Sequence, residues 1–517
     1  MRTMLSRFLS IVLGPIVSVA SAATCEGLAS LSLPNTTILL AQNIAAGAFT
    51  PPPQAGRAGG GRGANFSDLP AFCRVHASAK PTGDSDIRIE VWLPAGSSWN
   101  GKLRGTGNGG LGGGTGANPG ALAAGVRLGY ATAGNNTGHE GDSSYAIEHP
   151  EKIKDFGYRS AHEMTLTAKA LIKAFYGQDA KASYMAEGGG GTIAALSAAQ
   201  RYPTDYDAIA ATGMASYLTH HVFGQMWIWQ ATHKDAASFI PPEKYAVLHK
   251  AALDACDGND GLKDGIIGDP EHCRFDPGVT LCKGADGSEC LTAPQVEAAR
   301  KIYEGPHNPR TRAEVYSPMF PGSELGWGSL AGGAAPIGIP VEFFKYYVFR
   351  DPSWDYKTRP VNFDSDVALA DAPVNLPVDA VNPDLNAFFD RGGKLLLIDG
   401  WNDNQVPPKV AVNYYKAVVA KVGAKKVKKS MRFFMVPGME HGPGTNGAEN
   451  FNFDALALLT QWKENGIVPD ELIVTHYKDG TEAGKRLVCQ YPKIAFYKGS
   501  ANPEDPASFD CRASGSR

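Results

Sequence analysis

The sequence predicts an α/β protein in which helices cover both faces of a mostly parallel sheet and a second domain is inserted into the chain. In the first half, a short buried strand at 182–186 is followed by a helix at 192–201. The second half repeats this alternation as strand, helix, strand and helix at 394–398, 409–422, 431–436 and 453–464. Strands that alternate with helices are typical of a parallel sheet. Residues 215–375, between the halves, are rich in Trp, Pro and Gly and contain four of the eight cysteines, which indicates an inserted lid domain.

The chain begins with the features of a signal peptide, which we assign to residues 1–22. Two arginines precede a largely apolar stretch from Phe8 to Val19, and Ala20-Ser21-Ala22 supplies an A-x-A cleavage site. The apolar stretch is too short to span a bilayer, and Pro15 interrupts it. We therefore expect a secreted or periplasmic protein with no membrane partner.

The segment after the signal peptide leads into the core domain. Residues 23–63 are weakly patterned and end in a Pro-rich and Gly-rich tract, so we interpret them as an arm. Residues 87–93 alternate apolar and polar side chains, as a half-buried strand does, and a Gly-rich loop at 105–112 follows. Apolar residues at helical spacing predict a helix at 162–175. Together, these elements assign residues 23–214 and 376–517 to the core domain.

The eight cysteines fall into four local pairs, as expected for disulfides formed in an oxidising compartment. The pairs are Cys25 with Cys73, Cys256 with Cys273, Cys282 with Cys290, and Cys489 with Cys511. Since many other pairings are permitted by sequence alone, this nearest-neighbour scheme is a hypothesis. A formal net charge of −3 offers no electrostatic case for nucleic-acid binding. The basic run at 425–429 is interpreted as a solvated loop or helix end.

The strand, turn and helix at 182–201 form the arrangement in which an α/β-hydrolase places its nucleophilic serine. Here the turn is Glu187-Gly188-Gly189-Gly190-Gly191. Glycine has no hydroxyl, so an acyl-enzyme cannot form at Gly189. The backbone N–H groups of such a turn, at a helix N-terminus, still favour an anionic oxygen. We therefore predict an oxyanion hole that includes Gly110 and Gly190.

An acid and a histidine follow two successive strands near the end of the core. Asp403 lies just after the strand at 394–398, and His441 lies just after the strand at 431–436. The order of nucleophile turn, Asp and His is that of α/β-hydrolases. We predict that Asp403 contacts His441 and fixes its tautomer, so that both are catalytic.

A loop in the inserted domain carries three aspartates interleaved with glycines. Asp257, Asp260 and Asp264 offer hard oxygen ligands that suit Ca²⁺, and backbone carbonyls of Leu262 and Ile266 complete the predicted set. The spacing differs from that of an EF-hand. We expect the calcium to be structural.

Two adjacent histidines, His220 and His221, lie near Trp227 and Trp229 in the inserted domain. Adjacent histidines point in different directions and rarely bind one metal. We interpret this stretch as packing or pocket wall, with packing favoured.

Several segments spread over nearly the whole mature chain make it resemble the tannase/feruloyl-esterase family, which also includes mono-(2-hydroxyethyl) terephthalate hydrolase. These segments are Leu69–Val75, Trp99–Lys102, Gly129–Ala133, His149–Lys152, Asp155–Glu163, Ala199–Pro203, the aspartate loop Asp257–Asp264 and the closing Cys489–Cys511. The resemblance implies an α/β-hydrolase core with a lid, a calcium on the aspartate loop, and hydrolysis of esters of aromatic acids.

The sequence departs from the family pattern at the catalytic centre. The family has Gly-Cys-Ser-x-Gly at the elbow and His-Cys at the histidine. Without gaps, its serine falls on Gly189 and its two bridged cysteines fall on Gly188 and Gly442. Thr192 lies about one helical turn past the elbow, out of reach of its apex, and Ser197 and Ser183 are no better placed.

These departures leave three functions open, each for a small aromatic or phenolic ester-like substrate. The first is a serine-free enzyme in which His441 activates water, or abstracts a substrate proton in a lyase or isomerase reaction. The second is a non-catalytic binder of aromatic ligands. The third is conventional ester hydrolysis by an unrecognised nucleophile. Retention of Asp403 and His441 favours the first over the second.

Overall fold

The computed structural model describes residues 22–51, 65–108, 110–111, 117–443, 449–499 and 501–515. The predicted signal peptide lies outside these ranges except for Ala22, as do Gly109 and Gly112 of the Gly-rich loop.

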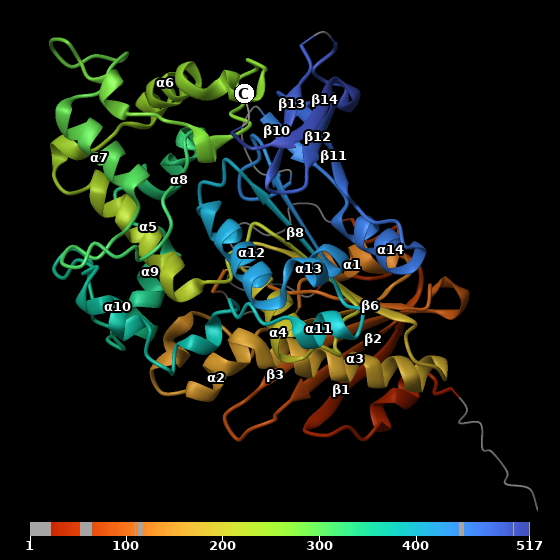
Figure 1. The fold of residues 1–517 in the computed structure, drawn as a ribbon. Coiled ribbons are helices and arrows are strands. Elements are labelled where there is room, and N and C mark those ends of the chain that lie inside the picture. The colour runs from red at the N-terminus through yellow and green to blue at the C-terminus, as the bar shows by residue number, and fades with distance from the viewer. Residues whose placement is uncertain are drawn as a thin grey trace, which may run out of the picture.

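A nine-stranded sheet runs through the centre of the molecule (Figure 1), in the order β1-β2-β3-β5-β4-β6-β7-β8-β9. Its strands are β1 (Thr36–Ile44), β2 (Phe72–Ala79), β3 (Ile87–Pro94), β4 (Lys102–Gly105), β5 (Ala131–Asn135), β6 (Ala182–Gly188), β7 (Ala208–Thr212), β8 (Lys394–Gly400) and β9 (Met431–Val436). Strands β1, β2, β3 and β5 pair antiparallel in that order, and all pairs from β5 to β9 are parallel. The mostly parallel sheet is thus confirmed.

The predicted arm at 23–63 is wrong for its first half. Residues Thr36–Ile44 form β1, which pairs with β2 at the edge of the sheet, and Cys25 is bonded to Cys73 of β2. No residue of β1 is fully buried, because an edge strand is covered by few neighbours. Its sequence therefore lacks the regular apolar alternation of a core strand.

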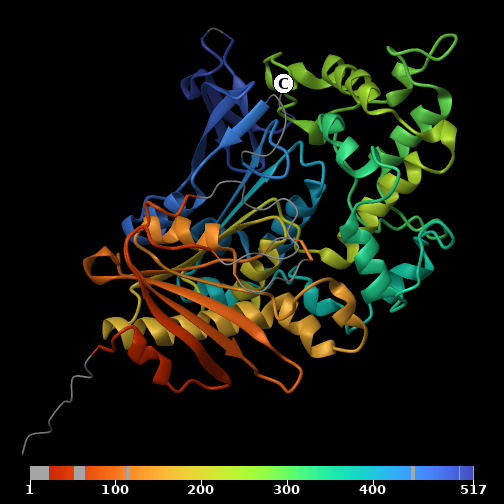
Figure 2. The same cartoon turned by 180° about the vertical axis from the view of Figure 1, so that it is seen from behind.

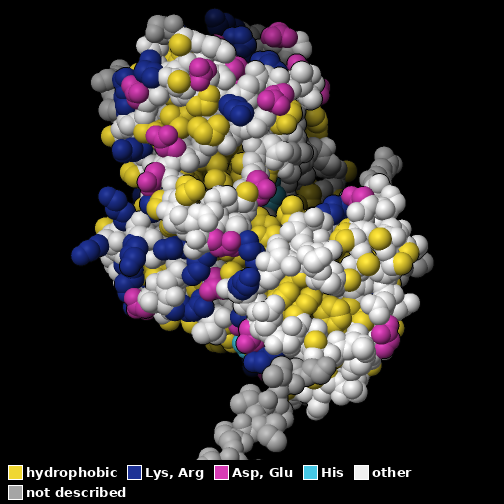
Figure 3. Space-filling model, turned by 90° about the vertical axis from the view of Figure 1, so that its right-hand side faces the viewer, with side chains coloured by type: hydrophobic (Ala, Val, Ile, Leu, Met, Phe, Trp, Pro, Cys, Tyr) yellow, Lys and Arg dark blue, Asp and Glu magenta, His cyan; other side chains and the backbone are white. Residues whose placement is uncertain are grey.

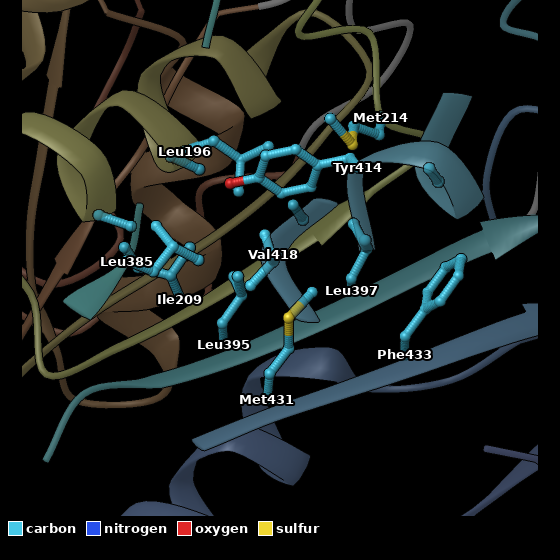
Figure 4. Close-up of a cluster of buried hydrophobic side chains, with 14 of the residues drawn as sticks. Leu196, Ile209, Met214, Leu385, Leu395, Leu397, Tyr414, Val418, Met431 and Phe433 are labelled. Carbon is cyan, nitrogen blue, oxygen red and sulfur yellow. The ribbon is translucent and has the colours of Figure 1, made fainter. Parts of the chain in front are cut away.

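Helices cover both faces of the sheet, as predicted. Helices α3 (Ser160–Tyr176), α4 (Gly191–Arg201) and α12 (Lys409–Val422) lie on one face, and α1 (Pro119–Arg127) and α14 (Ala455–Asn465) lie on the other. Figure 4 shows the first face, where Ile209, Leu395 and Leu397 meet Leu196 of α4 and Val418 of α12. The alternate residues of the same strands pack against α14, so each strand is buried on both sides.

Residues 215–375, the predicted inserted lid, form a group of helices to one side of the sheet (Figures 1 and 2). These helices are α5 (Leu218–Thr232), α6 (Tyr245–Cys256), α7 (Ala293–Glu304), α8 (Gly328–Ala331), α9 (Gly338–Phe343) and α10 (Ser365–Ala370). Helix α5 is buried along most of its length between this group and the core. It therefore carries side chains directly to the boundary between the two parts.

All four predicted disulfides are confirmed. Cys25–Cys73, Cys256–Cys273, Cys282–Cys290 and Cys489–Cys511 are each bonded, and together they use every cysteine of the chain. The last one joins β12 (Thr481–Cys489) of a three-stranded sheet to β14 (Phe509–Ala513) of a two-stranded sheet. Four disulfides are typical of proteins that mature outside the cytoplasm.

The surface carries charges of both signs. Figure 3 shows Lys and Arg side chains together with Asp and Glu across one face. The basic run at 425–429 lies in α13 (Ala424–Ser430), which buries Val427 and Ser430 and exposes most of its lysines, as interpreted from the sequence. Within the described ranges, no helix combines the length and the apolar character needed to cross a membrane.

Candidate active site

Asp403 and His441 follow two adjacent parallel strands, β8 and β9, and the structure brings their side chains into contact. Nδ1 of His441 lies 2.8 Å from Oδ2 of Asp403. The other carboxylate oxygen accepts hydrogen bonds from the N–H groups of Gln405, at 2.8 Å, and Val406, at 2.9 Å. Asp403 is fully buried. These bonds orient the carboxylate, so Nδ1 of His441 carries a proton and Nε2 is directed away from the acid.

Nε2 of His441 faces Gly189 in the turn between β6 and α4. A Cβ atom built on Gly189 would lie 2.9 Å from this nitrogen. The φ angle of Gly189 is +53°, which glycine adopts without the strain of other residues. Its N–H donates to the carbonyl of Thr212 at 2.9 Å, which fixes the turn. Gly189 thus occupies the place from which a hydrolase nucleophile would face its histidine.

The three hydroxyl groups considered from the sequence are either bonded to backbone carbonyls or buried within a strand. Thr192 donates to the carbonyl oxygen of Gly189 at 2.6 Å, and Ser197 donates to the carbonyl of Gly157 at 3.2 Å. Ser183 is buried within β6. These contacts agree with the expectation that Thr192 does not reach the apex of the elbow.

A pocket of about 990 Å³ opens above this turn. Gly189 and His441 line it, as do the predicted oxyanion-hole residues Gly110 and Gly190. The inserted helical segment contributes Leu218, His221, Gln225 and Ile339 to the wall. The pocket is therefore bounded by both the core and the helices beside it, and it is large enough for an aromatic ester.

The protonation of His441 is set by its acidic neighbours. Burial alone lowers the pKa of His441, but the charge and hydrogen bond of Asp403, with a further contribution from Asp399, raise that pKa to about 9. Asp399 is itself buried, and burial together with the charge of Asp403 raises its pKa to about 8. The acidic neighbours therefore favour the protonated form of the His441 imidazole.

Sequence reasoning gave no role at this site to Glu187, Gln225 or Asp399, and it favoured packing over pocket wall for His221. Burial raises the pKa of Glu187 to about 7, and its Oε2 lies beside Gly107 and Gly191, close to the predicted oxyanion hole. The sequence held one signal for a further site residue: Glu187 stands where the family has the first glycine of its elbow motif. His221 and Gln225 had no motif, and His221 proves to belong to the pocket wall.

The aspartate loop lies between α6 and Arg486 of β12. Asp257 accepts from the N–H of Gly265 at 3.0 Å, Asp260 accepts from Leu262 at 3.0 Å, and Asp264 accepts from Ile266 at 3.2 Å. Asp264 also pairs with Arg486 at 2.8 Å. Burial raises the pKa of Asp260 to about 7, and the charges of Asp264 and Asp257 act in the same direction. The three aspartates share one short loop, but their ligand atoms do not all lie within 4.8 Å of one another, so the calcium stays a prediction.

A different trio has the tightest grouping of possible metal ligands. Among the described residues, ligand atoms of Cys282, Asp286 and Cys290 lie within 4.8 Å of one another. The two cysteines form a disulfide, so they offer no thiolate. This grouping is therefore no metal site.

The parallel sheet, the elbow after β6 and the Asp–His pair after β8 and β9 define an α/β-hydrolase. A sequence profile described as "Tannase and feruloyl esterase" matches residues 73–512. The chain belongs to this family of carboxylic ester hydrolases.

Individual relatives cover most of the chain. An uncharacterised esterase of Xanthomonas campestris pv. campestris is 36% identical over 96% of this chain and 93% of its own. An Aspergillus flavus protein named "Probable feruloyl esterase B-1" is 31% identical, over 85% of this chain and 86% of its own. The crystal structure of feruloyl esterase B from Aspergillus oryzae superposes with a TM-score of 0.83 at 28% identity, covering 94% of this chain and 99% of that one.

Proposed function

We propose that this protein is a secreted or periplasmic enzyme that hydrolyses esters of aromatic acids or related phenolic substrates without a serine nucleophile. The observation that supports this most strongly is the intact Asp403–His441 pair, whose free nitrogen points at the space above Gly189. Where a serine hydroxyl would otherwise stand, a water molecule has room to bind.

In the proposed reaction, neutral His441 takes a proton from this water through Nε2 while the water oxygen bonds to the ester carbonyl carbon. The carbonyl electron pair moves onto its oxygen, and the N–H groups near Gly110 and Gly190 stabilise that charge. When the carbon–oxygen bond to the alcohol breaks, protonated His441 gives its proton to the leaving oxygen. The acid and the alcohol are released, and no covalent enzyme intermediate forms.

Three alternatives share the same pocket. His441 can act as a base on a substrate carbon in a lyase or isomerase reaction. An unrecognised nucleophile can restore conventional hydrolysis, although Thr192 and Ser197 donate to backbone carbonyls. If the protein is a non-catalytic binder of aromatic ligands, it needs neither a base nor a nucleophile.

The proposal is tested with a panel of gallate, ferulate and other aromatic esters, using the wild type and His441→Ala. We expect turnover by the wild type, a loss of about 10³-fold or more in the mutant, and full activity after treatment with a serine-directed phosphonate. Phosphonate inactivation would point to a conventional nucleophile. Ligand binding with no turnover of any ester would support the binder.

The proposed mechanism predicts an alkaline pH profile. Because the base must be neutral and its pKa is raised to about 9, kcat/KM should rise about tenfold per pH unit below that value and level off above it. The protonated pair also stabilises the fold, and this contribution is lost as pH rises from the ordinary histidine pKa of about 6.5 through 9. Steady-state kinetics from pH 6 to 10 measures the profile, and a flat line between pH 6 and 8 would contradict it.

We further propose that the aspartate loop holds a structural calcium. Asp257, Asp260 and Asp264 would supply carboxylate ligands, and Leu262 and Ile266 would supply carbonyl oxygens. The ion would offset the repulsion among the three carboxylates, of which Asp257 and Asp260 are buried, and so tie the loop to the neighbouring strands.

Calcium removal is therefore expected to lower thermal stability. At an ion concentration of about 100 times Kd, binding stabilises a protein by about 2.7 kcal/mol. For a chain of this length, dialysis against EGTA should therefore lower Tm by about 2–3 °C, and added Ca²⁺ should restore it. Asp260→Asn should abolish the response to Ca²⁺. Asp254→Asn, which changes an exposed carboxylate of α6, should keep it. An unchanged Tm in EGTA would exclude a stabilising calcium.

A further inference from the structure

A second cavity, of about 310 Å³, lies between the inserted helices and helix α12 of the core. Its wall combines His220 of α5, the loop residues Tyr316 and Ser317, and Asn413 and Tyr414 of α12. The proposed reaction uses none of these residues. The volume is at the lower end of the range for ligand pockets, which suits a molecule with a single ring.

The adjacent histidines of α5 belong to two different cavities. His220 lines the second cavity, whereas His221 lines the pocket that holds His441. Tyr316 lies at the boundary, since it lines the second cavity while its hydroxyl lies 3.5 Å from Nδ1 of His221. The two spaces share none of their described lining residues. The second cavity is therefore separate from the candidate active site.

Three tyrosines and a histidine give the second cavity an aromatic wall. The rings of Tyr217 and His220 are stacked, with their centroids 4.3 Å apart, and the ring of Tyr316 stands edge-on to Tyr217 at 6.2 Å. Tyr414 lines the wall from α12, and its hydroxyl already accepts from the amide of Gln200 at 3.0 Å. Such a wall suits another aromatic ring.

The hydroxyl of Tyr217 is available to a ligand in this cavity. It bonds to no described residue, and it is not among the buried polar atoms that lack a partner, so it keeps accessible surface. Burial, together with the charges of Asp379 and Asp371, raises the pKa of Tyr217, so the hydroxyl keeps its proton. A tyrosine hydroxyl both donates and accepts hydrogen bonds. It therefore matches a ligand hydroxyl, which does the same.

The charges around the cavity are acidic on balance. The described lining includes Glu314 and neither a lysine nor an arginine. Glu314 pairs with Lys409 at 2.7 Å, and Asp371 contacts Nε2 of His220 at 2.9 Å. Asp379 forms no ion pair with a described residue and accepts only uncharged donors. A bound carboxylate would meet this negative charge without a free cation, so an uncharged ligand is favoured.

We propose that this cavity is a second ligand site, which binds an uncharged single-ring phenol against the aromatic wall and bonds its hydroxyl to that of Tyr217. The acidic surroundings exclude an aromatic acid of the same size. The inference goes beyond the proposed function and does not depend on it, because binding in this cavity requires no turnover.

The methyl signal of Met214 in nuclear magnetic resonance spectra reports binding in this cavity. Met214 lines the cavity, belongs with Tyr414 to one cluster of buried side chains (Figure 4), and is not among the described residues of the pocket above Gly189. In protein labelled with ¹³C-methyl methionine, Met214→Leu assigns the signal. Titration with 4-methylphenol at neutral pH should move the signal with a Kd of about 1 mM, and 4-methylbenzoate should bind at least about tenfold more weakly.

Two variants and a matched control place the ligand. Tyr217→Phe removes the hydroxyl and keeps the ring, so it should weaken the binding of 4-methylphenol about 3- to 10-fold and leave that of toluene unchanged. Ala417→Phe puts a ring into the cavity from an exposed position of α12, and it should weaken both ligands at least about tenfold. Ala420→Phe, which is exposed on the same helix and outside the described lining, should change neither.

Any of three results would overturn the inference. A Met214 signal that 4-methylphenol does not move would show that the ligand does not enter the cavity. An unchanged Kd in Ala417→Phe or in Tyr217→Phe would place the ligand elsewhere. Equal affinity for 4-methylbenzoate would contradict the selection of an uncharged ring. The outcome is independent of ester turnover, so this site and the proposed hydrolysis can fail separately.

Discussion

Replacing Gly189 with Ser is expected to create a protein that a serine-directed phosphonate labels covalently, one group per chain. The new side chain would start 2.9 Å from Nε2 of His441, measured to its Cβ, so a small shift of the imidazole would place the hydroxyl against its base. The N–H groups beside the elbow would then act on an oxyanion, as in a conventional hydrolase. Intact-mass spectrometry after phosphonate treatment measures the result, with the unlabelled wild type as the reference.

The structure also predicts that Gly189→Ser destabilises the fold. At a φ of +53° a residue with a Cβ is strained, which we expect to lower the free energy of unfolding by about 1–3 kcal/mol. Gly189→Ala carries the same strain and the same Cβ without a hydroxyl. It should be unlabelled, and it should also lose the proposed water-dependent activity, because its methyl group fills the space in front of His441.

Gly189→Ser and Gly189→Ala together test the geometry of the elbow. Phosphonate labelling of the Ser variant would show that His441 and the backbone still form a hydrolytic site that lacks only its nucleophile. No labelling of a folded Ser variant would contradict that geometry. Full wild-type activity in Gly189→Ala would mean that the reacting water does not occupy the space above Gly189.

The main elements of the fold could be predicted because their sequences have strong periodicity. Helix α12 and strand β9 were predicted with the bounds that the structure shows, at 409–422 and 431–436. Strands β2, β4, β5 and β7 were not predicted, and the last three have only 4, 5 and 5 residues. The sequence of β7, Ala-Ile-Ala-Ala-Thr, is also rich in alanine, which has little preference for strands. Their strand state depends on pairing with neighbours.

The residues of the candidate site also fall into those that the sequence predicts and those that it does not. Asp403 and His441 could be predicted because the ends of adjacent parallel strands meet at one edge of a sheet. His221 and Gln225 lie far from them in the sequence and enter the pocket only through the packing of α5. The acidity of Asp399 and Glu187 likewise depends on burial and on neighbouring charges, which a linear pattern does not contain.

Asp403→Asn is expected to reduce kcat by about 10³- to 10⁴-fold, because it reverses the tautomer of His441. The amide oxygen of the new residue would accept from the N–H groups of Gln405 and Val406, as one carboxylate oxygen now does. Its NH₂ group would then face Nδ1 of His441 and donate to it. Nε2 would carry the proton, and in that form it cannot take one from water. Loss of the negative charge should also lower the pKa of His441 from about 9 and move the alkaline rise in kcat/KM to lower pH.

Asp205→Asn provides the matched control, since Asp205 is a buried carboxylate that contacts Nδ1 of a different histidine, His162, at 2.9 Å. Both variants remove the charge of a buried Asp–His pair, so both should lower Tm. Only Asp403→Asn should suppress turnover, because His441 lines the pocket and His162 does not. If Asp403→Asn kept kcat within a few-fold of the wild type, His441 would not depend on Asp403. That result would contradict the serine-free mechanism, in which Asp403 fixes the tautomer of the base His441.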